Sequence, residues 1–277
     1  MSRYNQEHIQ RFYDAYGEQE TLRWEKSPVE QVKFHVHRHY LQKHVQPGDR
    51  VLELGAGTGM FTRELAPLVS EMVVTDLSPV QLKLNQQRAQ EEGYEQLVQQ
   101  WAEVDICDLS QYSSDHFDAV VCYGGPLSYV FEKKGLALRE MQRVLRPQGK
   151  LLISVMNLWG TVHEYMHKII LPIDPEDNEK VMTTGDLHPD TFTDSDHHCH
   201  MFRATEFRTD LQEAGFNILD FSASNCLSAL RGEEIPKLQQ EPNKWAYFLD
   251  LEIRASASPG MVESGTHLLA VGQKVGT

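Results

Sequence analysis

From residue 49 onward, short apolar runs alternate with amphipathic segments. Apolar runs at residues 50–54, 71–76, 97–105, 117–124 and 150–156 predict buried strands, and the segments 61–69, 78–93 and 137–145 between them predict helices. Nearly continuous apolar strands that alternate with helices are typical of a parallel sheet covered on both faces. The pattern therefore predicts an α/β fold.

Two irregular stretches interrupt this alternation. Residues 157–200 and 225–264 show little periodicity, whereas a helix at 205–215 and strands at 216–224 and 266–273 restore the pattern around them. Long segments of this kind inside a compact domain usually carry function. We predict that they are insertions that cover the mouth of the sheet.

The segment before the alternating region reads as helical. Ser27 is placed to cap a helix that has Pro28 in its first turn and Glu30 at the capping-box position. Apolar residues then recur at spacings of three and four along one stripe. We predict that residues 1–48 form a helical unit of their own and that a second unit spans 49–277.

A glycine-rich turn, "GAGTG", follows the first predicted strand. The dinucleotide fingerprint G-x-G-x-x-G would require a glycine where Met60 stands, because the third glycine, Gly59, comes one position early. A nucleoside-triphosphate loop would require a lysine, and none follows. What remains is bare backbone that a ligand can approach closely.

Five ordered motifs around this turn resemble those of the class I S-adenosylmethionine-dependent methyltransferases. They are "VLELGAGTG", an aspartate 21 residues after Gly55, "VDICDL", "FDAVVCYGG" and "VLRPQGKLLISV". The resemblance is strong over residues 49–156 and looser over 201–224 and 265–274. It implies a doubly wound, mostly parallel seven-stranded sheet with an antiparallel last strand, a helical lid at 1–48 and two cap insertions.

The resemblance also implies S-adenosyl-L-methionine as the cofactor and assigns residues to it. Asp76 matches the carboxylate that holds both ribose hydroxyls, and a carboxylate can accept two hydrogen bonds at once. Asp105 matches the residue near the adenine amino group, with Asp108 as a competitor, and Glu53 matches the residue that serves the methionyl amine. The expected cofactor-binding residues are Tyr16, Glu53, Gly55, Ala56, Gly57, Gly59, Asp76, Leu77, Asp105, Ile106 and Tyr123.

The expected reaction is in-line methyl transfer to the oxygen or nitrogen of a small-molecule acceptor. Where the acceptor has a proton to lose, a histidine or carboxylate is the usual base. The first insertion is rich in histidine, and we predict His200 as the base and Tyr129 as a residue that orients the acceptor. Tyr13 and Arg23 are candidates for a lid over the cofactor's carboxylate.

Charge and cysteine content limit the partners. Asp and Glu outnumber Lys and Arg by 40 to 26, which gives a net charge of −14 and disfavours nucleic acid as a partner. Four widely spaced cysteines without a CxxC pair indicate reduced thiols, and the N-terminus lacks the apolar core of a signal peptide. No apolar run is long enough to span a bilayer. We expect a cytoplasmic protein without a membrane or nucleic-acid partner.

Two other functions compete with this interpretation. The segment from His163 to His167 matches H-E-x-x-H, in which Glu164 would be the base of a zinc protease, but the extended pattern fails at Ile170 and Ile173. We therefore expect no metal. In the other alternative, the protein binds S-adenosylmethionine without catalysing a reaction, as a sensor would. This remains open because a fold does not determine a function.

Overall fold

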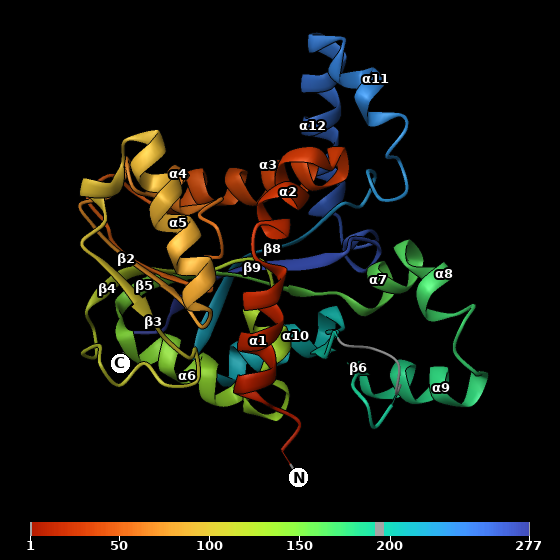
Figure 1. Ribbon diagram of the computed structural model, residues 1–277, viewed down its shortest axis with the longest axis horizontal. Helices are drawn as coiled ribbons and strands as arrows, with labels where there is room; N and C mark the ends of the chain where they lie inside the picture. Colours follow the sequence, from red (N-terminus) through yellow and green to blue (C-terminus); the bar gives the residue numbers. More distant parts are fainter. Residues whose placement is uncertain (1, 192–196, 277) are drawn as a thin grey trace.

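A seven-stranded sheet forms the centre of the molecule (Figure 1). The computed structural model describes residues 2–191 and 197–276, so residues 192–196 of the predicted insertion 157–200 lie outside the described residues. The strand order is β3-β2-β1-β4-β5-β9-β8. These strands are β1 (Arg50–Leu54), β2 (Glu71–Asp76), β3 (Gln100–Glu103), β4 (Phe117–Cys122), β5 (Leu145–Met156), β8 (Phe216–Ser224) and β9 (His267–Lys274).

The pairing confirms the predicted topology. β1 lies parallel to both β2 and β4, and β4 lies parallel to β5, whereas β9 runs antiparallel between β5 and β8. The first strand of the series, β1, therefore occupies the middle of the sheet, with the chain winding away on both sides. Carboxyl ends of the central parallel strands meet at one edge of the sheet, where ligands bind in open α/β folds.

Helices cover both faces, and further helices extend beyond the sheet edge (Figure 1). The α-helices are α1 (Gln6–Tyr16), α2 (Gln19–Lys26), α3 (Pro28–His44), α4 (Thr62–Leu65), α5 (Pro79–Glu92), α6 (Lys134–Val144), α7 (Leu158–Glu164), α8 (Met166–Ile169), α9 (Pro175–Thr184), α10 (Ala204–Glu213), α11 (Ile235–Gln239) and α12 (Pro242–Ser256). Short elements complete the described chain: η1 (Glu95–Leu97), η2 (Pro126–Tyr129), η3 (Phe131–Lys133), η4 (Val262–Ser264), β6 (Asp186–Leu187) and β7 (Cys199–His200).

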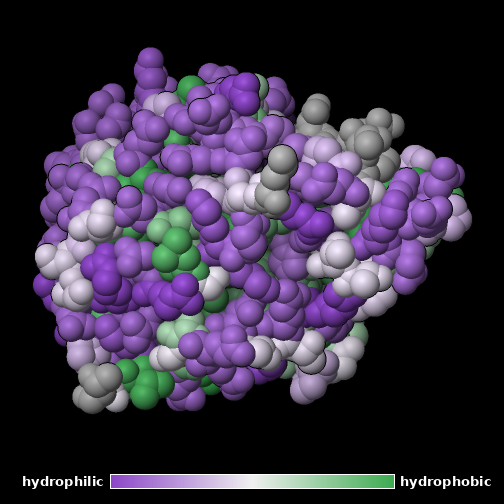
Figure 2. Space-filling view, turned by 90° about the horizontal axis from the view of Figure 1, so that it is seen from below, coloured by the Kyte–Doolittle hydropathy of each residue, from purple (hydrophilic) through white to green (hydrophobic). Residues whose placement is uncertain are grey.

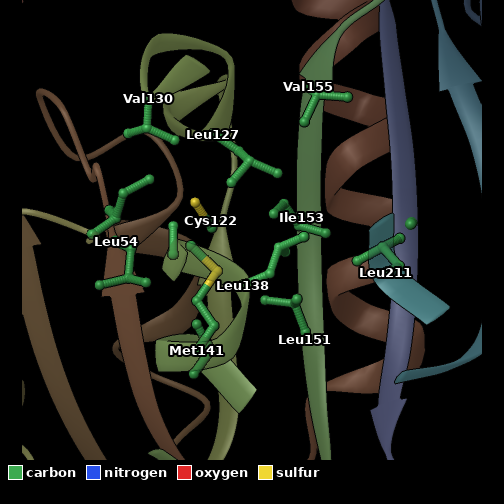
Figure 3. Packing of buried hydrophobic residues seen from close by; sticks show 14 of the residues in the cluster. Leu54, Cys122, Leu127, Val130, Leu138, Met141, Leu151, Ile153, Val155 and Leu211 are labelled. Carbon is green, nitrogen blue, oxygen red and sulfur yellow. The ribbon is translucent and has the colours of Figure 1, made fainter. Parts of the chain in front are cut away.

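The two faces of the sheet bury two hydrophobic clusters. One cluster joins β4 and β5 to α6 and α10, and Figure 3 shows Leu138 and Met141 of α6 pointing toward Leu151 of β5. The other cluster packs α3, α4 and α5 on the opposite face. Burial on both faces explains why the central strands read as unbroken apolar runs.

Local signals place several element ends correctly. Ser27 Oγ accepts a hydrogen bond from Glu30 N at the start of α3, and Ser78 Oγ accepts one from Gln81 N at the start of α5. Gly93 ends α5 in a left-handed conformation with φ of 78°. The predicted capping box is only half present, because the Glu30 carboxylate binds Lys33 and Arg23 instead of reaching back to Ser27.

Two predicted elements differ from the structure. The helix expected at 61–69 is only α4, Thr62–Leu65. The strand expected at 150–156 begins earlier, at Leu145, and contains an irregularity: β5 advances from Leu145 to Lys150 while β4 advances from Phe117 to Ala119, and Gln148 has φ of 66°. β5 pairs with β4 before and after this irregularity, so residues 146–149 remain part of the strand.

The surface is predominantly polar on the face drawn in Figure 2, where hydrophobic residues occupy small separate areas. Over the described residues, no helix has both the length and the apolar character that a membrane crossing requires.

The first insertion is anchored to the segment before β9 by a very close contact. A Cβ atom at Gly160 of α7 would lie 1.9 Å from the carbonyl oxygen of Gly265. We expect Gly160→Ala to lower the free energy of unfolding by on the order of 3 kcal/mol, because backbone has to move to admit the methyl group. Chemical denaturation checks this.

Gly232→Ala is the matched control, because no atom lies within 4 Å of a Cβ built at Gly232. Equal stabilities of the two variants would contradict the close packing of α7 on Gly265.

Candidate active site

A cavity of about 710 Å³ lies at the carboxyl ends of β1, β2 and β4. Its floor is formed by the glycine turn after β1, the residues that follow β2 and β3, and the loop that follows β4. Its other walls come from α1 and α2, from α7 and α8 of the first insertion, and from the start of β9. Segments far apart in the sequence therefore share one enclosed space.

The three glycines of the turn have different tasks. All have positive φ: 64° at Gly55, 55° at Gly57 and 89° at Gly59. A Cβ at Gly55 would lie 2.4 Å from Pro126 Cγ, and one at Gly59 would lie 2.7 Å from Asn85 Oδ1. Two glycines thus allow close packing, whereas Gly57, whose nearest neighbour would be 3.9 Å away, leaves space on the cavity side.

Asp76, at the end of β2, presents a buried carboxylate to the cavity. Oδ2 accepts a hydrogen bond from Gly57 N at 2.8 Å, and Oδ1 accepts one from Ser78 N at 2.8 Å. Burial raises the pKa of Asp76 to about 6, although these bonds oppose the shift. Each oxygen can accept a further hydrogen bond, so the carboxylate has capacity for a hydroxyl-bearing ligand.

Asp105 lies after β3 on the same wall of the cavity. Its Oδ1 accepts from Cys107 N at 2.8 Å, and its Oδ2 accepts from the hydroxyl of Tyr4 at 2.6 Å. Leu77 and Ile106, each directly after its aspartate, also line the cavity and add apolar surface. The arrangement suits a flat polar ring between apolar side chains.

The N-terminal helices are fixed over this floor. Gln81 of α5 donates from Nε2 to the carbonyl oxygens of Tyr13 at 3.0 Å and Gly17 at 3.2 Å. Arg23 of α2 binds Glu20 at 2.5 Å and Glu30 at 2.8 Å. A guanidinium with two carboxylate partners is held in place on the cavity wall.

Three ring side chains form a hydrogen-bonded chain across the cavity. Tyr13 donates to the hydroxyl of Tyr129 at 2.5 Å, and the Tyr129 hydroxyl lies 3.0 Å from His197 Nε2. Burial, with the nearby charge of Arg23 as a second cause, lowers the pKa of His197 to about 4. His197 is therefore neutral near pH 7 and can accept the hydrogen bond.

Comparison with known proteins finds similarity to methyltransferases. Residues 51–149 match a family model described as a methyltransferase domain. The ubiquinone/menaquinone biosynthesis C-methyltransferase UbiE of Ectopseudomonas mendocina is 38% identical over 112 residues, which are 39% of this chain and 42% of that protein. Its counterpart in Shewanella frigidimarina is 32% identical over 147 residues, 50% of this chain and 56% of that protein. This chain thus spans about half the length of these relatives.

Over residues 51–149 the chain is similar to methyltransferase domains, in agreement with its resemblance to the class I S-adenosylmethionine-dependent methyltransferases.

Solved structures of low sequence identity share the fold of this methyltransferase domain. A putative methyltransferase in a complex with the Haloferax volcanii Trm112 activator gives a TM-score of 0.62 at 19% identity, covering 97% of this chain and 98% of that one. The N-methyltransferase NodS of Bradyrhizobium japonicum, in complex with S-adenosyl-L-homocysteine, gives 0.54 at 18% identity, covering 91% and 90%.

The residues of the methyltransferase cavity fit S-adenosylmethionine, the cofactor of the family. Asp76 has lone pairs to spare for two ribose hydroxyls, and Asp105 lies between apolar residues that suit an adenine ring. Gly57 leaves room for close approach to backbone. Of the predicted cofactor residues, the structure brings these to the cavity wall: Tyr16, Gly55, Ala56, Gly57, Asp76, Leu77, Asp105, Ile106 and Tyr123.

Two predicted cofactor residues lie outside the cavity lining. Gly59 packs against Asn85, behind the turn. Glu53 is buried below the turn, where Oε2 accepts a hydrogen bond from Thr62 Oγ1 at 2.6 Å. Burial raises the pKa of Glu53 to about 8. Glu53 therefore links β1 to α4 instead of facing the cavity.

His200, predicted as the general base, also lies outside the cavity. Its Nδ1 lies 2.6 Å from Asp186 Oδ1 and its Nε2 lies 2.9 Å from Glu206 Oε1. Although burial opposes it, bonding to these carboxylates raises the pKa of His200. Both ring nitrogens are occupied, so this position corrects the prediction. Tyr129, in contrast, lines the cavity as expected.

The H-E-x-x-H segment does not form one helix. α7 ends at Glu164 and α8 begins at Met166, so His163 and His167 do not share one continuous helical face. Within the part of the chain that the structure describes, no group of three or more His, Cys, Asp or Glu side chains is arranged to hold a metal ion.

Several cavity residues were not predicted. Tyr4 and Lys33 come from the N-terminal unit, Tyr165 and Lys168 from the first insertion, and His267 from the start of β9. None is a defining residue of a motif, since Tyr165 fills only a variable position of the H-E-x-x-H segment, and the packing of distant segments brings them together. The sequence signal for His267 is limited to its position near the start of the predicted strand 266–273.

Glu53 gives a test of site electrostatics. Its raised pKa means that folded protein retains a proton that unfolded chain releases, so wild-type stability falls by about 1.4 kcal/mol per pH unit as the pH rises from 4.5 to about 8. Glu53→Gln removes this slope. We expect the variant to gain stability relative to wild type across this window, as measured by denaturation at pH 5 and pH 8.

A stability difference that stays constant between the two pH values would show that Glu53 is ionised in the folded protein.

Proposed function

We propose that this protein transfers a methyl group from S-adenosylmethionine to an oxygen or nitrogen atom of a small-molecule acceptor held in the cavity. The observation that carries the proposal is the single cavity that joins Asp76, Asp105 and Gly57 at one end to the insertion helices at the other. Cofactor and acceptor would share this space, so that acceptor and methyl donor are held together away from water.

The residues of this chain would divide the work by position. Asp76 binds the ribose hydroxyls, and Asp105 with Leu77 and Ile106 holds the adenine ring. Arg23, fixed by Glu20 and Glu30, is placed to bind the carboxylate of the cofactor's amino-acid end. S-adenosylmethionine supplies an electrophilic methyl group on a sulfonium sulfur.

The other half of the cavity would hold the acceptor. Its apolar residues include Met156, Ile169, Ile173, Leu187 and Met201. Such a lining favours a small organic molecule, and a net charge of −14 supports a partner other than nucleic acid. Tyr129 and its hydrogen-bonded partner His197 would orient this molecule from one side.

The names of the relatives suggest a further acceptor atom. The UbiE proteins are C-methyltransferases of ubiquinone and menaquinone biosynthesis, so carbon is the alternative site of methylation for this protein. Incubation with methyl-labelled S-adenosylmethionine and a small-molecule extract tests transfer, and the labelled product identifies the atom. Cofactor binding without labelled product would favour a sensor.

Calorimetry with S-adenosylhomocysteine tests the adenosine site. We expect Asp105→Ala to weaken binding about tenfold or more, because a carboxylate at the adenine position is lost. Asp108→Ala is the matched control: Asp108 is exposed and does not line the cavity. An equal loss of S-adenosylhomocysteine affinity in both variants would overturn the assignment of Asp105 to the adenine position. So would the absence of binding to the wild-type protein.

A further inference from the structure

His267 lines the cavity at the start of β9, on the opposite side of β1 from Asp76 and Asp105. It is the first residue of β9, paired with Met156 of β5 on one side and Ser224 of β8 on the other. Its Nε2 lies 3.9 Å from the point that a Cβ at Gly125 would occupy, beside the loop that follows β4. The ring is thus placed rigidly at the carboxyl edge of the sheet.

Neighbouring hydrogen bonds select the tautomer of this ring. Asn225 donates from Nδ2 to the carbonyl oxygen of Val29 at 2.9 Å, which leaves Asn225 Oδ1 to accept the hydroxyl of Thr266 at 3.2 Å. With its hydrogen committed there, Thr266 Oγ1 can only accept from His267 Nδ1, which lies 3.4 Å away. Nε2 is then the nitrogen with the free lone pair.

No hydrogen bond to this Nε2 is present within the described parts of the chain, residues 2–191 and 197–276. Burial and the charges of Lys33, His37, Arg23 and His197 lower the pKa of His267 well below its usual value. The ring is therefore neutral near pH 7. It offers the cavity one hydrogen-bond acceptor.

Two of the three cations that line the cavity are paired with carboxylates, and Lys168 is the third. Arg23 comes from α2, Lys33 from α3 and Lys168 from α8, and all three line the cavity. Asp76 and Asp105, by contrast, lie at the other end. Glu20 and Glu30 are bound to Arg23, and Glu30 also binds Lys33 at 2.7 Å. Burial raises the pKa of Glu164, which does not line the cavity.

An ammonium group would be poorly accommodated in such a site. It would lose its water among apolar side chains and lie near the Lys168 cation, without gaining a carboxylate that is not already paired. A hydroxyl that can lose its proton is favoured near Lys168, because a positive charge stabilises a developing oxyanion. The available acceptor nitrogen also requires a ligand group that donates.

We propose that the acceptor carries a weakly acidic hydroxyl, as in a phenol or an enol, on an apolar body, and that this hydroxyl donates a hydrogen bond to His267 Nε2. The inference rests on the proposed function and refines it, because it names the chemical class of the acceptor and the residue that recognises it. An aliphatic amine is excluded as a ligand of this site.

Calorimetry on the full chain saturated with S-adenosylhomocysteine tests the inference with three probes of similar shape. These are para-butylphenol, para-butylbenzylamine, which is an ammonium ion at neutral pH, and para-butyltoluene, which has no polar group. We expect the phenol to bind at least about tenfold more tightly than either of the others. Equal affinities, tighter binding of the amine, or no binding of the phenol would overturn the inference.

Two variants assign the effect to His267. His267→Phe keeps a ring but removes the acceptor nitrogen, and we expect the phenol's preference over the toluene to disappear. His267→Gln places an amide oxygen near the position of Nε2 and is expected to restore part of this preference. His163→Gln is the matched control, because His163 is exposed and does not line the cavity.

The affinity for S-adenosylhomocysteine, measured in the same titrations, distinguishes a failure of the proposed function from a failure of the inference about His267. Its loss from wild-type protein would overturn the proposed function. Retention of that affinity in His267→Phe, with an unchanged preference for the phenol, would show that the variant folds and that His267 does not recognise the hydroxyl.

Discussion

The site depends on the close approach of backbone at the glycine turn after β1. Gly55 lets the turn pack against Pro126 of the loop after β4, and Gly59 lets it pack against Asn85 of α5. Held from both sides, the turn aims Gly57 N at the Asp76 carboxylate at 2.8 Å. A side chain at either packing position would push the turn away from its neighbours, and the ends of β1, β2 and β4 would no longer share a floor.

Buried charge next to this floor is balanced almost completely by local partners. Arg23, Glu20, Glu30 and Lys33 form one connected set between α2 and α3. Asp76 is different, since its hydrogen bonds come from the neutral backbone groups of Gly57 and Ser78 and burial raises its pKa. A buried carboxylate without a cation is costly in the free protein, and a ligand hydroxyl relieves part of that cost. Stability and cofactor affinity are thus opposed at this residue.

The first insertion closes the cavity by way of contacts with the N-terminal helices, whereas the second predicted cap, residues 225–264, contributes no residue to the cavity wall. Tyr13 of α1 bonds to Tyr129, and Phe12 stacks on the His197 ring at a centroid distance of 5.5 Å. Outside the cavity, Asp186 and Glu206 hold the two ring nitrogens of His200, which joins the strand pair β6–β7 to α10. The histidines of the first insertion therefore have separate tasks, with His197 on the cavity wall and His200 in a structural ion cluster.

The sequence by itself determined the sheet, its helices and the glycine turn and aspartates of the cavity floor, because these depend on short-range signals. Apolar strand runs, the caps at Ser27 and Ser78 and the glycine turn each act within a few residues, and Asp76 and Asp105 follow their strands directly. Only the tertiary structure determined which residues of the N-terminal helices, the first insertion and β9 line the rest of the cavity. His200 meets the carboxylates of Asp186 and Glu206, 14 and 6 residues away in the chain, whereas His267 reaches the cavity because β9 pairs with the distant strand β5. Contacts of this kind leave no periodic pattern in the sequence, because they form only when the complete fold brings separate elements together.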